Sequence, residues 1–213
     1  IPAFTVAESL HGSAHEGSTI FPQNIALGST FNPELAYRRA CMTAGDLHAQ
    51  GMRQVLAPCI DVVRDLRWGR VEESYGEDPY LCGIFARSEV KGYLDSGISP
   101  MLKHYGPHGN PLGGLNLASV DCGVYDLHAV YLKPFEMVLR HLPVYAVMST
   151  YNSWNRKPHT SLRTGLQKDH IQILQSTHDE QPYLYKPPPV SPPLPIGTIQ
   201  DNTHWKPLHR VRQ

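Results

Sequence analysis

The sequence contains no long hydrophobic run and no excess of charge of either sign. No apolar stretch approaches the roughly 18 residues that a membrane-spanning helix needs, which predicts that the chain is not a membrane protein. The 19 basic and 19 acidic side chains cancel, so the charge balance does not favour binding to nucleic acid or to an anionic membrane surface. We therefore expect neither a nucleic acid nor a membrane among its partners.

Cysteine is also scarce, and its pattern lacks the common zinc and redox motifs. The four cysteines form no CxxC pair and lie in apolar or mixed stretches: Cys41, Cys59, Cys82 and Cys122. This favours buried thiols over disulfides. The histidines that could be imagined as ligands show no HExxH motif and no His/carboxylate spacing: His11, His15, His104 and His108. We predict no metal site.

Proline is in excess, and its distribution divides the chain. Nineteen of the 213 residues are proline, about 9% against a usual level of about 5%. Eight of them lie between Pro182 and the end, whereas residues 1–158 hold 15 of the 17 glycines. A proline-rich run lacks the donors and the flexibility to join a helix or sheet, so we predict a folded domain over residues 1–158 and a divergent, disordered tail over residues 159–213.

The chain begins at Ile1 without methionine or a signal peptide, which predicts that it begins inside a longer protein.

Before residue 158, short apolar segments alternate with longer helical patterns. Asn32 and Asp78 each precede a proline, a combination that starts a helix because the side chain caps free N–H groups and proline fits the first turn. Helical patterns cover residues 33–51, 78–94 and 125–141, the last with a break expected at Pro134. Short apolar segments predict strands at residues 3–7, 54–60, 99–103 and 144–149.

This alternation indicates an α/β fold with parallel strands in chain order. Four βα units make half of an eight-fold barrel, because a whole one takes about 250 residues. The predicted fold is therefore a partial (β/α)8 TIM-type barrel of about four βα units, followed by the disordered tail. A half barrel has two unpaired strand edges, so we also expect self-association through them.

Polar side chains directly follow every predicted strand. In a barrel of this kind, chemistry gathers at the carboxyl ends of the strands. Glu8 follows the first strand, residues 61–70 the second, Lys103 and His104 the third, and residues 148–152 the fourth. Converging polar groups suit a hydroxyl-rich ligand such as a sugar, in which each hydroxyl needs a donor or an acceptor.

Several charged groups near these ends have a structural alternative. Arg67 is as consistent with an ion pair to Asp65 as with a ligand contact, and Trp68 fits core packing as well as a scaffold for the neighbouring arginines. Four acidic residues are interpreted as ion-pair partners and a helix cap rather than as catalytic groups: Glu72, Glu73, Glu77 and Asp78.

Residues 65–79, Asp-Leu-Arg-Trp-Gly-Arg-Val-Glu-Glu-Ser-Tyr-Gly-Glu-Asp-Pro, resemble the signature stretch of glycoside hydrolase family 3. Five further motifs follow the order and approximate spacing of that family: residues 8–12, 19–22, 103–104, 131–136 and 147–152. Six motifs in register are highly specific, and the resemblance covers residues 1–158. The chain is most similar to bacterial β-glucosidases and β-xylosidases.

The resemblance implies retaining hydrolysis of terminal, non-reducing β-linked glucose or xylose, without a cofactor. The partner implied is a β-linked oligosaccharide or glycoside, and a periplasmic or extracellular location would fit the bacterial family. Six positions match family residues that bind the terminal sugar: Glu8, Arg70, Lys103, His104, Met148 and Tyr151. Glu8 is longer than the aspartate common in β-glucosidases, which favours xylose because xylose lacks the hydroxymethyl group.

The resemblance stops before the chemistry. The family nucleophile is an aspartate about 30 residues beyond the position of Tyr151, after another strand, but here the pattern ends at Pro158. Asp179 lies near that distance, with no strand before it and a proline-rich run after it. In the family, the acid/base normally comes from a later domain or loop. We therefore predict no catalytic carboxylate and no turnover in this chain. A non-catalytic carbohydrate-binding chain and a truncated or frame-shifted product without function are the alternatives.

One departure lies inside the matched region. Some family members carry an arginine about eleven residues after the Lys-His pair, where this chain has Gly113 and Gly114. The identity of the sugar is therefore left open.

Overall fold

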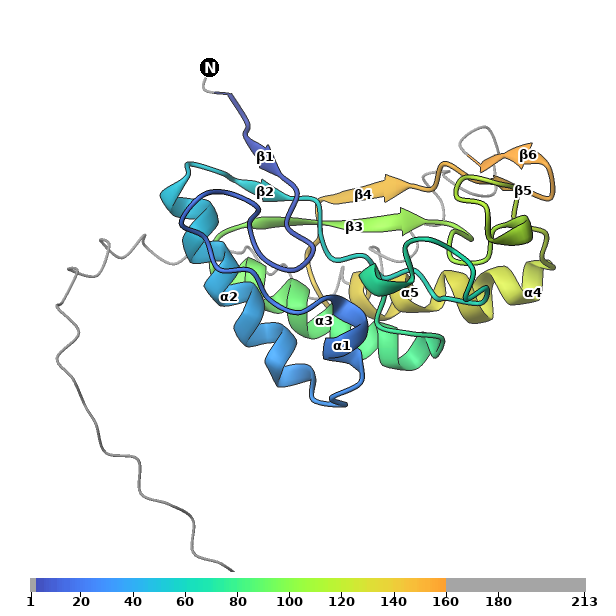
Figure 1. Cartoon of the computed structure of the whole chain (residues 1–213), viewed down its shortest axis with the longest axis horizontal. Helices are drawn as coiled ribbons and strands as arrows, with labels where there is room; N and C mark the ends of the chain where they lie inside the picture. The colour runs from blue at the N-terminus through green and yellow to red at the C-terminus, as the bar shows by residue number, and fades with distance from the viewer. Residues whose placement is uncertain (1–2, 160–213) are drawn as a thin grey trace, which may run out of the picture.

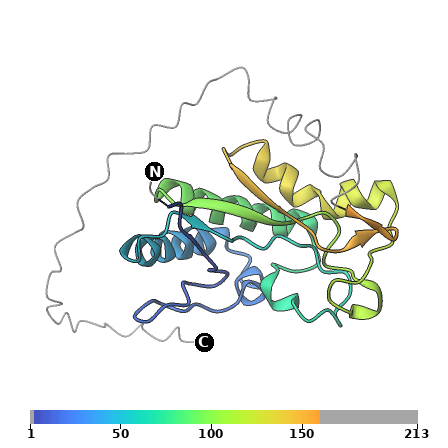
Figure 2. The ribbon, with the colours of Figure 1, turned by 90° about the horizontal axis from the view of Figure 1, so that it is seen from above.

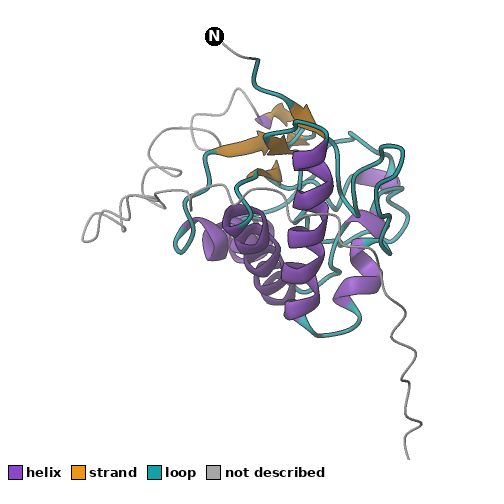
Figure 3. Cartoon of the chain, turned by 90° about the vertical axis from the view of Figure 1, so that its left-hand side faces the viewer, coloured by secondary structure: helices purple, strands orange, loops and turns teal. Residues whose placement is uncertain are grey.

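The computed structural model describes residues 3–159, which form a parallel sheet covered on one side by helices (Figures 1 and 3). The strands are β1 (Val6–Ala7), β2 (Gln54–Val55), β3 (Ser99–Tyr105) and β4 (Ala146–Ser149). They lie in the order β1-β2-β3-β4, and every neighbouring pair is parallel. This confirms the parallel α/β arrangement in chain order.

The long helices follow the strands as predicted. Helix α2 (Pro33–Ala49) comes after β1, and helix α3 (Pro79–Asp95) comes after β2. Asn32 accepts a hydrogen bond from the amide of Glu34 at 3.2 Å, and Asp78 accepts one from the amide of Leu81 at 2.7 Å. Both caps satisfy helix N–H groups that would otherwise lack partners, so the two predicted helix starts are confirmed.

The helical stretch after β3 is broken into three parts. It contains α4 (Val124–Asp126), a π-helical turn η3 (Leu127–Tyr131) and α5 (Lys133–Leu139). The break falls just before Pro134, which lacks the N–H needed to continue a helix, as predicted. The π-helical turn was not predicted. Three further short elements were also missed: α1 (Asn24–Gly28), η1 (Val71–Glu73) and η2 (Leu112–Gly114).

The second strand is shorter than the predicted residues 54–60. Pro58 has no N–H to donate to a ladder, so regular pairing ends at Val55. The chain nevertheless continues beside β3: the carbonyl of Pro58 accepts from the amide of Lys103 at 3.2 Å, and the amide of Ile60 donates to the carbonyl of Lys103 at 2.8 Å. This irregular continuation carries the residues that follow β2 to the carboxyl end of β3.

The core lies between the sheet and the helices. Seen from above in Figure 2, β3 lies along α3. The largest buried cluster joins Ile60 and Leu102 from the sheet side to Phe85 of α3 and Phe135 of α5. Burial of these apolar side chains is the main stabilising contribution to such a layer pair. The helices therefore fix the strands, and with them the groups at the strand ends.

A buried polar network joins the helices to the loop after β2. Arg39 of α2 pairs with Glu89 of α3 at 2.5 Å and donates to the amide oxygen of Asn24 at 2.6 Å. Asn24 in turn donates to the backbone carbonyl of Glu73 at 2.7 Å, and the Tyr75 hydroxyl donates to Glu89. Because both charges of the pair are out of water, they need these partners. The loop at residues 70–75 is thereby tied to the helix layer.

After β4 the chain forms a hairpin that was not predicted, with β5 (Ser153–Trp154) antiparallel to β6 (Lys157–Pro158). All four cysteines are free thiols, as expected, but only Cys59 and Cys82 are buried, whereas Cys41 and Cys122 are partly buried. Within residues 3–159 no helix is long and apolar enough to cross a membrane. Asp179 and the predicted tail beyond residue 159 lie outside the described residues.

Candidate functional site

Glu8 and Lys103 meet across the carboxyl ends of β1 and β3. The ammonium of Lys103 forms an ion pair with a carboxylate oxygen of Glu8. The Lys103 side chain is only 4% exposed, whereas that of Glu8 is 52% exposed. A buried ammonium needs an opposite charge, and the carboxylate supplies it while still facing solvent. One charged pair therefore links two of the predicted site residues at the end of the sheet.

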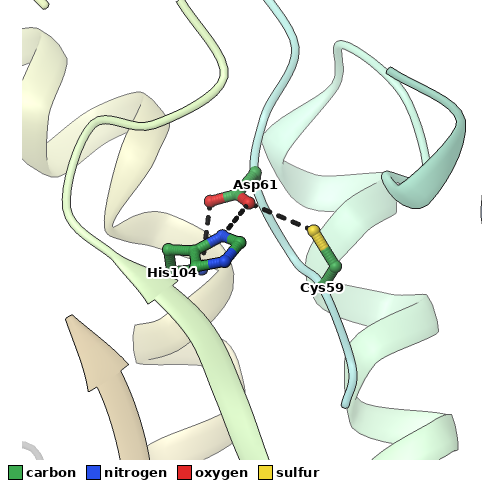
Figure 4. Close-up of side chains that lie close together, drawn as sticks. All are labelled: Cys59, Asp61 and His104. Carbon is green, nitrogen blue, oxygen red and sulfur yellow. Dashed lines mark hydrogen bonds and ion pairs between the residues drawn. The ribbon is translucent and has the colours of Figure 1, made fainter. Parts of the chain in front are cut away.

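His104 is held by the buried carboxylate of Asp61 (Figure 4). One oxygen of Asp61 accepts from the backbone amide of His104 at 3.1 Å, and the other lies 2.7 Å from Nδ1 of the same residue. Burial by itself would raise the pKa of Asp61, but the charge interactions with His104 and His108 and the hydrogen bond from His104 hold it well below the usual range. Asp61 is therefore an ionised acceptor directly behind His104.

Cys59, Asp61 and His104 are the three residues that could hold a metal ion among those the structure describes. Their ligand atoms all lie within 4.8 Å of one another, and all three side chains are buried. In the structure they are joined instead by hydrogen bonds, with the thiol of Cys59 donating to Asp61 at 3.1 Å. Burial and the charge of Asp61 raise the pKa of Cys59, so the thiol keeps its proton. Sequence spacing missed the group because Cys59 and Asp61 follow β2 whereas His104 lies in β3.

Arg70 lies in the loop after β2, where Glu73 fixes its orientation. The guanidinium donates through Nε at 2.8 Å and through Nη2 at 2.7 Å to the two carboxylate oxygens of Glu73. This bidentate hydrogen bond outweighs burial and raises the pKa of Arg70. The predicted ion-pair role of Glu73 is confirmed. Nη1, the remaining nitrogen, lies 3.5 Å from Nε2 of His108.

His108 connects three parts of the site. Its ring stacks on that of His104 with centroids 4.0 Å apart, and its Nδ1 lies 2.7 Å from the hydroxyl of Thr150 at the end of β4. Burial lowers the pKa of His108 to about 4, so the ring is neutral at pH 7. From the sequence, His108 was imagined only as a metal ligand, and its place in this group was not predicted. The available signal was its place just beyond the end of β3.

Met148 and Tyr151 complete the group on the side of β4. Met148 is the register partner of Lys103 and is partly buried. The ring of Tyr151 lies 6.4 Å from that of His104, centroid to centroid, and Tyr151 is 70% exposed. All six predicted residues thus lie at one end of the sheet. Arg70 connects to the others through His108.

Two residues with open alternatives take structural places. Arg67 is 71% exposed and forms a bidentate pair with Asp65, with Nη2 at 2.7 Å. Trp68 is buried, packs edge-on against His108 and donates to Asn116 at 3.0 Å. Gly113 and Gly114 stand where some family members carry an arginine. Gly114 has φ +73°, and a Cβ at this position would lie 2.5 Å from the Cβ of Arg67. A side chain at Gly114 would therefore require the Arg67 loop to move.

A model of the glycosyl hydrolase family 3 N terminal domain matches residues 1–172. The chain belongs to glycoside hydrolase family 3. The sheet and helices of residues 3–159 are accordingly part of the TIM-barrel-like domain of this family, which confirms the partial barrel predicted from the sequence.

Sequence relatives carry the names of two activities. A β-xylosidase from Formosa agariphila is 33% identical over 183 residues, covering 79% of this chain and 25% of that protein. A periplasmic β-glucosidase from Salmonella typhimurium is 33% identical over 169 residues, covering 76% of this chain and 21% of that protein. The family 3 chain spans about a quarter of the length of these relatives.

Solved structures show the same arrangement. A β-glucosidase from Erythrobacter marinus superposes with a TM-score of 0.78 at 29% identity, covering 82% of this chain and 24% of that one. β-Glucosidase 3B from Thermotoga neapolitana, in complex with glucose, gives a TM-score of 0.74 at 29% identity, covering 82% and 26%.

Proposed function

We propose that residues 3–159 form the part of a retaining exo-β-glycosidase site that holds the terminal, non-reducing glucose or xylose of a β-linked oligosaccharide or glycoside. The observation that carries this proposal is the gathering of Glu8, Arg70, Lys103 and His104 at the carboxyl ends of adjacent parallel strands. Such a cluster suits a ligand with several neighbouring hydroxyls. The names of the β-xylosidase and β-glucosidase relatives support it, as does the structure of a family member in complex with glucose.

The charged side chains supply both acceptors and donors for the hydroxyl groups of a sugar. The half-exposed carboxylate of Glu8 accepts from hydroxyl groups, whereas Lys103 and Arg70 donate to hydroxyl oxygens. Glu8 and Glu73 keep these two cations in place before any ligand arrives, so less side-chain entropy is lost on binding. The exposed ring of Tyr151 and the side chain of Met148 form the less polar side of the same site.

We further propose that the chain binds sugar without hydrolysing it. Retaining hydrolysis needs a nucleophilic carboxylate and a second carboxyl as acid/base. Among residues 3–159, the carboxylates at this end of the sheet are already engaged: Glu8 with Lys103, Glu73 with Arg70, and Asp61 with His104. Neither catalytic role is assigned to them. For the parent protein of the family, we propose hydrolysis of the terminal sugar and a periplasmic or extracellular location.

Calorimetric titration of the 213-residue chain with xylose and with glucose tests the binding. We expect saturable binding that Arg70→Ala weakens about tenfold or more, because a charge-assisted donor is lost. Arg67→Ala is the matched control, because that arginine is exposed and pairs elsewhere, and its affinity should stay within about twofold of wild type. Absence of saturable binding by the wild-type chain would overturn the proposal.

Hydrolysis is tested separately with aryl β-glucosides and aryl β-xylosides. We expect no release of the aryl alcohol above the uncatalysed rate. Release in proportion to protein concentration would refute the absence of turnover while leaving the sugar-binding proposal in place.

A further inference from the structure

Asp61 is a buried, charged residue to which the proposed sugar contacts give no role. Its side chain is fully buried, and both of its oxygens face the same neighbour, His104. One oxygen takes the backbone amide and the other takes Nδ1, so the carboxylate fixes the residue at two points. A buried carboxylate is costly unless its hydrogen bonds are made, and here they converge on one histidine.

We propose that Asp61 is a positioning residue that keeps the proton of His104 on Nδ1, so that Nε2 accepts a hydrogen bond from a sugar hydroxyl. The inference rests on the proposed function and deepens it by assigning the direction of one hydrogen bond. An ionised carboxylate only accepts, so the ring nitrogen 2.7 Å from it must carry hydrogen. Nε2 is then the nitrogen that can serve a ligand, and its role is set before the ligand arrives.

The surroundings of Asp61 hold it in this orientation. The thiol of Cys59 donates to the oxygen that also faces Nδ1, at 3.1 Å, and the hydroxyl of Ser74 donates to the backbone carbonyl of Asp61 at 2.5 Å. On the other side, His104 stacks on His108 at 4.0 Å. Since His108 is neutral at pH 7, this stacking places no positive charge against the ring of His104. The ring is therefore held by its backbone, by its Nδ1 and by its face.

A carboxylate that only stabilised the fold would leave the sugar affinity unchanged when His104 changed tautomer, so the tautomer and the affinity together separate the two roles. Asparagine has the size of aspartate but can donate as well as accept. In Asp61→Asn, the amide oxygen can keep the backbone hydrogen bond while its NH2 group donates to Nδ1. The proton of His104 then moves to Nε2, which turns from an acceptor into a donor.

The experiment uses the 213-residue chain with 15N-labelled histidine, and the signal of His104 is identified by its loss in His104→Gln. Long-range 1H–15N spectra at pH 7 distinguish the two neutral tautomers and the imidazolium. We expect the Nδ1–H tautomer in wild type, a shift toward Nε2–H in Asp61→Asn, and xylose and glucose affinities about tenfold lower in that variant. The control is Asp65→Asn, the same chemical change in the same loop. Asp65 pairs with Arg67, so tautomer and affinity should stay as in wild type.

An Nε2–H tautomer or an imidazolium in the wild-type chain would overturn the inference, and this holds even where Asp61→Asn does not fold. An Asp61→Asn variant with unchanged tautomer and unchanged affinity would overturn it as well. If the wild-type chain binds neither sugar, the proposed function fails, whereas the tautomers of wild type and variant still decide the role of Asp61.

Discussion

The ends of β3 and β4 lie side by side, yet their side chains are held in opposite ways. Lys103 and His104 at the end of β3 are buried, and each has a carboxylate partner from another segment. Met148 in β4 is partly buried and Tyr151 beyond it is mostly exposed. The difference follows from position, because β3 has a neighbour on both sides, whereas β4 pairs with β3 alone among the described strands.

This contrast shows which half of the proposed sugar site is organised before a ligand arrives. On the side of β3, the charges are fixed by partners and by the core beneath them, so binding needs little rearrangement. On the side of β4, the groups lie at a sheet edge of the described structure and keep more conformational freedom. The predicted self-association concerns both edge strands of this sheet, β1 and β4, and stays a prediction.

The largest expected effect is on the free energy of unfolding, and it tests the contrast between the ends of β3 and β4. Asp61→Ala leaves the amide and Nδ1–H of His104 and the thiol of Cys59 without an acceptor, so we expect the free energy of unfolding to fall by about 3–5 kcal/mol. The corresponding change beyond β4, Tyr151→Ala, should cost about 0.5 kcal/mol or less, because that ring is exposed. Urea unfolding followed by circular dichroism measures both. Similar losses in the two variants would remove the contrast.

The second prediction concerns acid. The pKa of His108 is about 4 in the folded chain, because of burial, against about 6.5 when unfolded. The unfolded state therefore binds more protons between these values, and stability falls as the pH drops from about 6.5 toward 4. His108→Gln removes this contribution. We therefore expect the decrease in the free energy of unfolding between pH 7 and pH 5 to be about 2 kcal/mol smaller in this variant than in wild type. Urea unfolding at both pH values is the measurement.

The exposed His141 offers a matched control for this measurement. His141→Gln should keep the wild-type dependence on pH, because that ring is not buried among the site residues. Asp61 acts at lower pH: its folded pKa is depressed, so its contribution is lost only as the pH falls below about 4. A wild-type slope in His108→Gln would contradict the burial of a neutral His108.

Much of this arrangement could be predicted from local sequence, and the remainder depends on contacts between distant segments. The caps at Asn32 and Asp78 are local chemistry, and the strand ends placed Glu8 and Lys103 at one end of the sheet. The pairing of Asp61 with His104 joins positions 43 residues apart. It depends on how the irregular chain after β2 runs along β3, which no local pattern specifies.

Two other features were missed for related reasons. The hairpin of β5 and β6 turns through Asn155 and Arg156, both with positive φ. A glycine would have indicated such a turn in the sequence, whereas these two residues do not. His108 joins the site because its ring reaches Thr150, directly after β4. In each case, the missing information was tertiary packing.

The smallest predicted effect concerns the choice of sugar. Glu8→Asp shortens the side chain that reaches Lys103 and leaves room for a hydroxymethyl group, so we expect the ratio of glucose to xylose affinity to rise by about threefold. Glu34→Asp, at the start of α2 and away from the sheet end, serves as the control with an unchanged ratio. Competition titrations with the two sugars measure it, and an unchanged or lowered ratio in Glu8→Asp would contradict the assignment.

The central claim, that the end of β3 is the organised half of a sugar site, is tested most directly by titrating xylose and glucose into a matched pair of variants. Lys103→Met removes the buried ammonium. Met148→Leu changes Met148, the register partner of Lys103 on β4, with little change in volume. The account predicts that Lys103→Met lowers affinity about tenfold or more, while Met148→Leu stays within about threefold of wild type. Equal losses in the two variants, or full affinity in Lys103→Met, would contradict it.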